Sequence, residues 1–152
     1  MSFFKKTTNV KDKPTLDKAD KPKQKDQPQS FMEDLQANTD QLKQAFSYPT
    51  NNALKMRNLY LPFYEKHITL FYVEATVNTA IIDSHIIEPL LNEPVQPLET
   101  DDIVSMFIDS VLTTADANKI TTIQDATKDM LSGNTIVLLE GELQGISIDT
   151  VG

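Results

Sequence analysis

The alternation of apolar and polar residues is clearest in the last quarter of the chain, where it predicts two strands. Ile136–Leu139 is continuously apolar, which is typical of a strand covered on both faces. After a turn at Glu140–Glu142, apolar and polar residues alternate, so a return strand is expected with Ser147 on its solvent-facing side. Gly133 suits the left-handed position that ends a preceding helix. We expect this hairpin at the centre of a small sheet.

Two more strands are predicted in the first half of the chain. Alternation from Leu54 to about Leu61 indicates a half-buried strand, which Pro62 ends. Ile68–Val73 is apolar and aromatic nearly throughout, so it is expected in a central position. The loop over residues 113–121 leaves room for a short extended piece at Lys119–Thr121.

Apolar positions spaced three to four residues apart predict four helices. Ser30 and Glu33 have the spacing of a capping box, so the first helix is expected to begin at Ser30 and to end before Pro49. A second helix follows Asn78, and Pro89 is expected to kink it. The residues of these two helices expected to face the core are Phe31, Leu35, Asn38, Leu42, Ala45, Phe46, Ile82, Ile86 and Leu90.

The other two helices have recognisable N-terminal signals. The third is expected to begin at Thr100, because Asp101 and Asp102 then lie where the helix dipole favours negative charge. The fourth is expected to be capped by Thr122 together with Asp125. The residues expected to face the core are Ile103, Val104, Phe107, Ile108, Val111, Ile123, Ala126, Met130 and Leu131.

The order of these elements predicts an α/β (mixed α+β) domain over residues 30–152. Strand pairs joined through a helical region favour a small mixed β-sheet of about four strands, packed by three to four helices in two or three layers. Residues 92–97 are expected to be an extended linker. Residues 1–29 contain three prolines and few apolar residues, so we expect a disordered basic tail. The alternative is a basic arm that lies near anionic lipid.

Charge and composition narrow the classes of function. Residues 1–30 hold eight lysines and four aspartates, a formal +4, whereas the rest of the chain holds six basic and eighteen acidic groups, a formal −12. An acidic domain argues against nucleic acid as a partner. The absence of cysteine excludes disulfides and thiolate chemistry and fits a cytosolic setting. Apolar runs fall short of the roughly 20 residues that span a bilayer, and no signal peptide precedes them, so we expect this chain to be soluble.

The search for catalytic chemistry gives no convincing constellation. His67 and His85 are the only histidines. Asp83-Ser84-His85 contains the residue types of a nucleophilic triad, but adjacent residues on a helix do not face one another. Asp101, Asp102 and Asp109 are better explained by a helix N-terminus and a solvated helix face than by metal binding. We therefore expect no catalytic and no metal-binding residue.

Cofactor binding is equally unsupported by the sequence. Gly133 with Asn134 does not make a phosphate-binding loop, since the chain lacks a G-x-x-x-x-G-K pattern. Phe63, Tyr64, Phe71 and Tyr72 form an aromatic cluster without a basic groove, which favours core packing over nucleobase stacking. We expect no cofactor.

Four passages, in the same order, resemble the N-terminal cytosolic part of the A subunits of spore germination receptors, the GerA family of endospore-forming bacteria. They are Phe31–Phe46 (FMEDLQANTDQLKQAF), residues 73–91 (VEATVNTAIIDSHIIEPLL) after the strand that begins at Leu70, Thr122–Gly133 and Thr135–Gly152 (TIVLLEGELQGISIDTVG). The second resembles the family's helix "D-G-L-V-D…I…I-L-x-P-L", the third its helix ending in "L-L-S-G", and the fourth "D-T-x-L-L-I-D-G…A-x-x-x-D-T-x-G".

The chain also departs from the family pattern. Ala75 stands where the family usually has glycine, and Asn78 where it often has aspartate. The family's Arg/Pro/Glu-rich segment and its membrane region lie outside this chain.

The resemblance implies a function in nutrient sensing. The intact A subunit joins a soluble region of two subdomains to transmembrane helices. It works with B and C subunits and other A subunits in the spore inner membrane and starts germination. Residues 30–152 would be the first subdomain, on the cytoplasmic (spore core) side, attached to the membrane through a C-terminal region absent from this chain. The family is not an enzyme family and offers no catalytic residue. The expected role is assembly or signal transduction.

Three other readings remain open. One is a small-ligand-sensing α/β module with a pocket between sheet and helices. Another is a hydrolase that uses acidic residues. The last is a sporulation-specific paralogue of the receptor A subunit with the same architecture.

Overall fold

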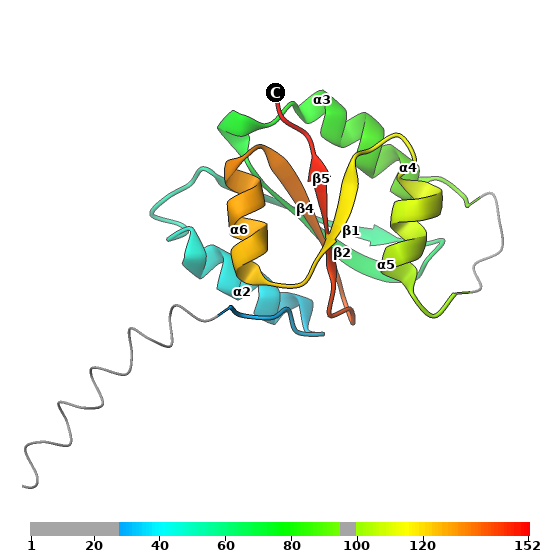
Figure 1. Ribbon diagram of the computed structural model, residues 1–152, viewed down its shortest axis with the longest axis horizontal. Helices are drawn as coiled ribbons and strands as arrows, with labels where there is room; N and C mark the ends of the chain where they lie inside the picture. The colour runs from blue at the N-terminus through cyan, green and yellow to red at the C-terminus, as the bar shows by residue number, and fades with distance from the viewer. Residues whose placement is uncertain (1–27, 95–99) are drawn as a thin grey trace, which may run out of the picture.

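The computed structural model describes residues 28–94 and 100–152, which fold into an antiparallel sheet with helices on both faces (Figure 1). The sheet has five strands in the order β1-β2-β4-β5-β3. Their bounds are Leu54–Leu61 (β1), Lys66–Val73 (β2), Ala117–Ile120 (β3), Asn134–Leu139 (β4) and Gly145–Asp149 (β5).

The helical elements divide between the two faces of the sheet. They are α2 (Leu35–Ala45), η1 (Glu74–Thr76), α3 (Thr79–Ile81), η2 (Ile82–Ile87), α4 (Glu88–Leu91), α5 (Ile103–Met106), η3 (Phe107–Val111) and α6 (Ile123–Leu131). α3, η2 and α4 follow one another without a break and form one helical rod, and α5 continues directly into η3. None of the helices in the described residues is long and apolar enough to cross a membrane.

The register of the sheet decides which side chains share a face. Phe71 of β2 lies opposite Ile136 of β4, and Leu70 lies opposite Val137. Paired residues point to the same face of the sheet, and successive residues point to opposite faces. All four pairings are antiparallel, so this alternation carries across the whole sheet.

α2 and α6 cover one face, which we call the α2 face. The side chains buried there come from the N-terminal segment, both helices and four of the strands. They are Phe31, Leu35, Leu42, Phe46, Leu54, Phe71, Val73, Ile120, Ile123, Ala126, Met130, Ile136 and Leu138.

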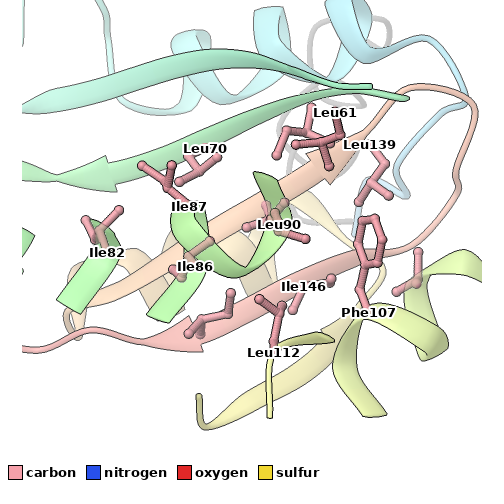
Figure 2. Close-up of a cluster of buried hydrophobic side chains, with 14 residues drawn as sticks. Leu61, Leu70, Ile82, Ile86, Ile87, Leu90, Phe107, Leu112, Leu139 and Ile146 are labelled. Atoms are coloured by element: carbon pink, nitrogen blue, oxygen red, sulfur yellow. The ribbon is translucent and has the colours of Figure 1, made fainter. Parts of the chain in front are cut away.

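The rod α3-η2-α4 and the helix α5-η3 cover the opposite face, which we call the α4 face. Figure 2 shows Ile86 and Leu90 of the rod together with Phe107 of η3, packed toward Leu70, Leu139 and Ile146 of the strands. The buried side chains of this core are Leu61, Ile68, Leu70, Ile82, Ile86, Ile87, Leu90, Val104, Phe107, Leu112, Val137, Leu139, Ile146 and Ile148.

The expected mixed α+β class is confirmed, and the domain has three layers. The sheet differs from the expectation in two details. It has five strands rather than about four, and all its pairings are antiparallel rather than mixed. The extra strand is β3. A short extended piece was expected at Lys119–Thr121, and the strand covers Ala117–Ile120, where it pairs with β5.

The first helix begins later than its sequence indicates. Ser30 does not cap it but forms a β-bridge with Thr122. Asp34 is the N-cap instead, and its side chain accepts a hydrogen bond from the amide of Gln36. The predicted core stripe is buried except for Ala45, which is exposed.

Two helices widen into π-type turns that the sequence pattern did not predict. In η2 the amide of Glu88 donates to the carbonyl of Asp83, five residues back, just before Pro89. Proline has no amide hydrogen, so the regular helical bond is interrupted at that position anyway. The third helix begins at Ile103 rather than Thr100, with Asp102 as its N-cap.

The C-terminal hairpin is mostly as expected. Thr122 caps α6, its side chain accepting from the amide of Asp125, and Gly133 has a positive φ of 99°. Two predictions there are wrong. Leu131 is 63% exposed, and Ser147, expected to face solvent, is only 1% exposed because α6 covers the α2 face of β5.

Two expectations fall largely outside the described residues. Residues 1–27 of the expected tail and residues 95–99 around the end of the expected linker are not described. Gln29 does belong to the fold, since its carbonyl accepts from the amide of Ile123 and its amide donates to the side chain of Gln124.

Candidate functional site

A groove of about 560 Å³ lies on the α2 face, between α2 and the strands β1 and β2. The site exists because α2 does not cover the middle of β1, where Asn58 and Tyr60 are exposed. Its lining residues are Leu35, Gln36, Thr39, Lys43, Met56, Asn58, Leu59, Tyr60, His67, Ile68, Thr69 and Glu140.

The floor of the groove is polar although it belongs to the sheet. Thr69 is 2% exposed and donates a hydrogen bond of 2.7 Å to the side-chain carbonyl of Asn58, its cross-strand partner. The next pair, Tyr60 and His67, brings the two rings to 4.7 Å between centroids with a 52° tilt. A floor of this kind offers hydrogen bonds and one aromatic face to whatever occupies the groove.

The wall of the groove has a negative group, from the residue after β4, at the beginning of α2 and a positive group on the last turn of α2. The carboxylate of Glu140 accepts from the amide of Leu35 at 3.3 Å, at the beginning of α2. Lys43, eight residues further along α2, holds its ammonium 5.5 Å from the ring centroid of Tyr48. The groove therefore has an acidic end and a basic end.

The groups gathered in the groove suit binding. Within the described part of the chain, no hydrogen bond in the groove pairs a hydroxyl nucleophile with a general base; the Thr69 hydroxyl donates to the side-chain carbonyl oxygen of Asn58. A nucleophilic mechanism needs such a pair together with donors for the developing oxyanion. Metal chemistry has no site either among residues 28–94 and 100–152, where no group of three or more His, Asp or Glu side chains is placed to hold an ion.

Two residues of the Asp83-Ser84-His85 triplet have partners outside the triplet. Asp83 forms an ion pair of 3.3 Å with Arg57, while the hydroxyl of Ser84 donates to the carbonyl of Ala80 on its own helix. These side chains are engaged with different partners, as the helix spacing predicted.

Asp102 caps the helix α5. It accepts from the amide and hydroxyl of Ser105, at 3.0 and 2.8 Å, and from Lys119 at 3.3 Å. These contacts lower the pKa of Asp102 from 3.8 to about 2. The largest effect comes from the hydrogen bond of the Ser105 backbone amide, followed by that of the Ser105 hydroxyl and by Lys119. Asp109 is exposed on η3 and takes no part in this cluster.

The four aromatic residues singled out from the sequence do not form a platform. Phe71 is fully buried on the α2 face, whereas Tyr64 packs edge-on against Phe107 in the core of the α4 face, at 4.8 Å between centroids. Burial raises the pKa of Tyr64. Phe63 is 44% exposed in the turn between β1 and β2. Tyr72 is partly buried against the core of the α4 face.

Sequence reasoning missed the groove, although one signal pointed to it. Asn58 and Thr69 occupy positions of β1 and β2 that face the same side as Met56 and Phe71. A cross-strand pair of polar residues in line with an apolar pair indicates that the covering layer ends there. That signal can be read only when the register is known.

Comparison with known proteins gives the chain a family and a structural relative. The sequence profile of the family described as Bacillus/Clostridium GerA spore germination protein matches residues 40–152. Among solved structures, the chain is similar to the crystal structure of the N-terminal domain of the A subunit of the Bacillus megaterium spore germinant receptor GerK3. The TM-score is 0.62, with 14% sequence identity over 81% of this chain and 97% of that chain. No curated protein matches the sequence.

These findings carry different weight. At 14% identity the similarity to the GerK3 domain shows a shared fold, and a fold by itself does not define a function. The family profile, in contrast, matches the sequence itself over most of its length, including all five strands. The chain therefore belongs to the GerA family of spore germination proteins.

Proposed function

We propose that this chain is the cytosolic first subdomain of a nutrient germinant receptor A subunit, and that it acts in receptor assembly or signal transduction. The observation that carries the proposal is the family match over residues 40–152, joined to a fold shared with an A-subunit domain. Its partners are the B and C subunits and other A subunits of a receptor in the spore inner membrane. The domain lies on the cytoplasmic side and performs no chemistry of its own.

The charge of the domain supports contact with proteins rather than with lipid. The chain after residue 30 has a formal charge of −12, which an anionic membrane surface repels. Several large apolar side chains are nevertheless exposed, among them Leu131 at 63% and Leu143 at 56%. Exposed apolar side chains on an acidic domain suit protein partners.

The test places a charge on these apolar positions in the full-length protein. Leu131→Lys and Leu143→Lys should reduce receptor abundance in the spore membrane or block germination, because a charge cannot be desolvated at an apolar contact without a partner. Asn118→Lys, at an exposed polar position of β3, is the matched control and should behave as wild type. Germination is followed by the fall in absorbance of a spore suspension after addition of nutrient, and abundance by immunoblot. Normal abundance and germination in both leucine variants would refute the proposal.

Small-ligand sensing is a second candidate, favoured by the groove between α2 and β1. Its volume of about 560 Å³ and its amide, hydroxyl and carboxylate groups suit a small polar molecule. Amino acids, sugars and nucleosides, added one at a time to the isotope-labelled chain, should then shift the amide signals of Asn58, His67 and Thr69. Unchanged spectra at millimolar ligand would exclude this role for the groove.

A further inference from the structure

The outer edge of β1 is open along its length. β1 ends the sheet, and its register with β2 places Ala53 opposite Glu74, whose amide donates to the carbonyl of Ala53. In an antiparallel ladder such bonded pairs alternate with non-bonded pairs. The odd-numbered residues of β1 therefore bond to β2, while the amides and carbonyls of Leu54, Met56, Asn58 and Tyr60 point outward. Among the described residues, no backbone group bonds to them.

The other edge of the sheet is treated differently. Directly after β3, the backbone of Gln29–Phe31 pairs with Thr121–Ile123: the amide of Phe31 donates to Thr121, and that of Ile123 donates to Gln29. β3 itself is only four residues long. Short or covered edges are the usual protection against unwanted strand pairing, and β1, at eight residues, has neither.

The two cations of β1 do not block its groove side. Lys55 and Arg57 project from the α4 face of the strand, where Lys55 lies 3.7 Å from Glu74 and Arg57 lies 3.3 Å from Asp83. The side chains on the α2 face are Met56, Asn58 and Tyr60, which line the groove. A strand added to β1 would carry alternate side chains on that same face.

The charges of the groove match the spacing of such a strand. Glu140 is level with Tyr60, because its amide bonds to the carbonyl of His67, the cross-strand partner of Tyr60. It follows β4 and therefore lies two strand spacings, about 10 Å, from β1, so a long basic side chain that extends across the groove is needed to approach it. Lys43 lies eight residues along α2 from Leu35, about 12 Å at the helical rise. Side chains four residues apart on a strand are separated by about 14 Å. An occupant with a basic residue near Glu140 and an acidic residue four positions away, near Lys43, complements both.

We propose that β1 and the adjoining groove form a docking site for an extended segment of a partner protein. The segment adds antiparallel to β1, with a basic side chain opposite Tyr60, a small polar one opposite Asn58 and an acidic one opposite Met56. Main-chain bonds to the outward groups supply affinity, and the two charges set the register. The docking site extends the proposed function. It depends on that function only for the assumption that the occupant is a protein.

The test uses the isotope-labelled full chain and a capped peptide, T-K-V-S-T-E-T. Its lysine, serine and glutamate fall opposite Tyr60, Asn58 and Met56. Binding should slow hydrogen exchange at the amides of these three residues and leave those of Arg57 and Leu59, already bonded to β2, unchanged. The control T-V-K-S-E-T-T has the same composition but places its charges two apart on the other face, and should bind about tenfold more weakly. No protection at millimolar peptide, or equal binding of both peptides, would overturn the proposal.

Protein variants separate edge pairing from a general surface effect. Asn58→Pro removes one outward amide and keeps the backbone hydrogen bonds to β2; it also removes the side-chain bond to Thr69, as Asn58→Ala does. It should weaken peptide binding at least about tenfold, and each tenfold loss corresponds to about 1.4 kcal/mol. Asn58→Ala keeps that amide and should bind within about threefold of wild type. Unweakened binding by a folded Asn58→Pro chain would contradict the mechanism.

Should Asn58→Pro unfold the hairpin, Lys43→Glu gives an independent test on α2. It should shift preference by about tenfold toward T-K-V-S-T-K-T, and an unchanged preference would refute the charge assignment. Protection of Met56, Asn58 and Tyr60 that grows with the concentration of the chain alone would identify a second copy as the occupant and overturn the proposal. Because these measurements use no spores, their failure removes the edge site and leaves the receptor proposal to its own test.

Discussion

Ser147→Ala tests how much the hydrogen bonds between α6 and the sheet contribute to the stability of the fold. The hydroxyl of Ser147 donates to Asp129 of α6 at 2.8 Å and accepts from the side-chain amide of Asn134 at 2.9 Å. On sequence alone this serine faces solvent, and its removal should cost under about 0.5 kcal/mol, as for most surface substitutions. In the structure it is 1% exposed and links a helix to two strands.

The magnitude follows from the two hydrogen bonds. A bond to a charged group contributes about 1.5–3 kcal/mol and a neutral one about 1 kcal/mol. Asp129 and Asn134 are only partly buried, so in the variant water can form hydrogen bonds with them in place of the missing hydroxyl. We therefore expect Ser147→Ala to lower the free energy of unfolding by about 2 kcal/mol, or the Tm by about 4–8 °C for a chain of this length.

The assay is urea unfolding followed by circular dichroism, with the Tm measured alongside. Ser84→Ala is the matched control, because Ser84 is exposed and its hydroxyl only donates to a carbonyl of its own helix. The control should stay within about 0.5 kcal/mol of wild type. Equal stability of the two variants would show that the bonds to Asp129 and Asn134 do not hold α6 to the sheet.

Other consequences of the fold can be measured in the same way. Leu138→Ala, at 1% exposure, should cost about 2–5 kcal/mol in urea unfolding. Gly145→Ala should lower the free energy of unfolding by about 1–3 kcal/mol, because its methyl group would lie 2.5 Å from a methyl of Leu138. Wild-type stability of this variant would mean that the Leu138 side chain moves aside without cost. Because the pKa of Asp102 is lowered in the fold, its carboxylate stabilises the fold above about pH 4, and this stabilisation is lost as the pH falls toward 2. Asp102→Asn should therefore flatten the decline of Tm between about pH 4 and pH 2. Parallel Tm curves for the variant and the wild type would contradict this. Deleting residues 1–27 should leave the Tm unchanged, whereas deleting 1–31 removes a buried phenylalanine and should lower it by several degrees; equal Tm values would place the boundary elsewhere.

The sequence predicts elements well where one physical signal dominates. β1 was predicted at the bounds it has, because its alternation is flanked by a turn and by Pro62. Thr122 was identified as a cap because its hydroxyl, three residues before Asp125, has one obvious amide to satisfy. Gly133 was placed in the left-handed region because a helix ends there. These features depend on neighbours in the sequence.

The errors arise where a distant segment competes for a residue. Ser30 has the spacing of a cap, but it pairs with the backbone of Thr122, and Asp34 takes the capping role. Ser147 follows the pattern of a solvent-facing position, yet Asp129 satisfies its hydroxyl under α6. A pocket between sheet and helices was one of the alternatives, but its place could not be predicted, because it depends on the register of β1 with β2 and on where α2 stops covering them.

The ends of the described fold lie at opposite ends of the sheet, and this decides how the domain carries mechanical load. Gln29–Phe31 pairs beside the end of β3, next to the start of β5, whereas Val151 pairs with Val77 beyond the other end of β5 (Figure 1). The five residues of β5 span about 17 Å between these points. A pull applied between residues 29 and 152 therefore runs along the strands. It loads the hydrogen bonds of β5 to β3 and β4 together instead of one at a time, so we expect the domain to resist unfolding under tension.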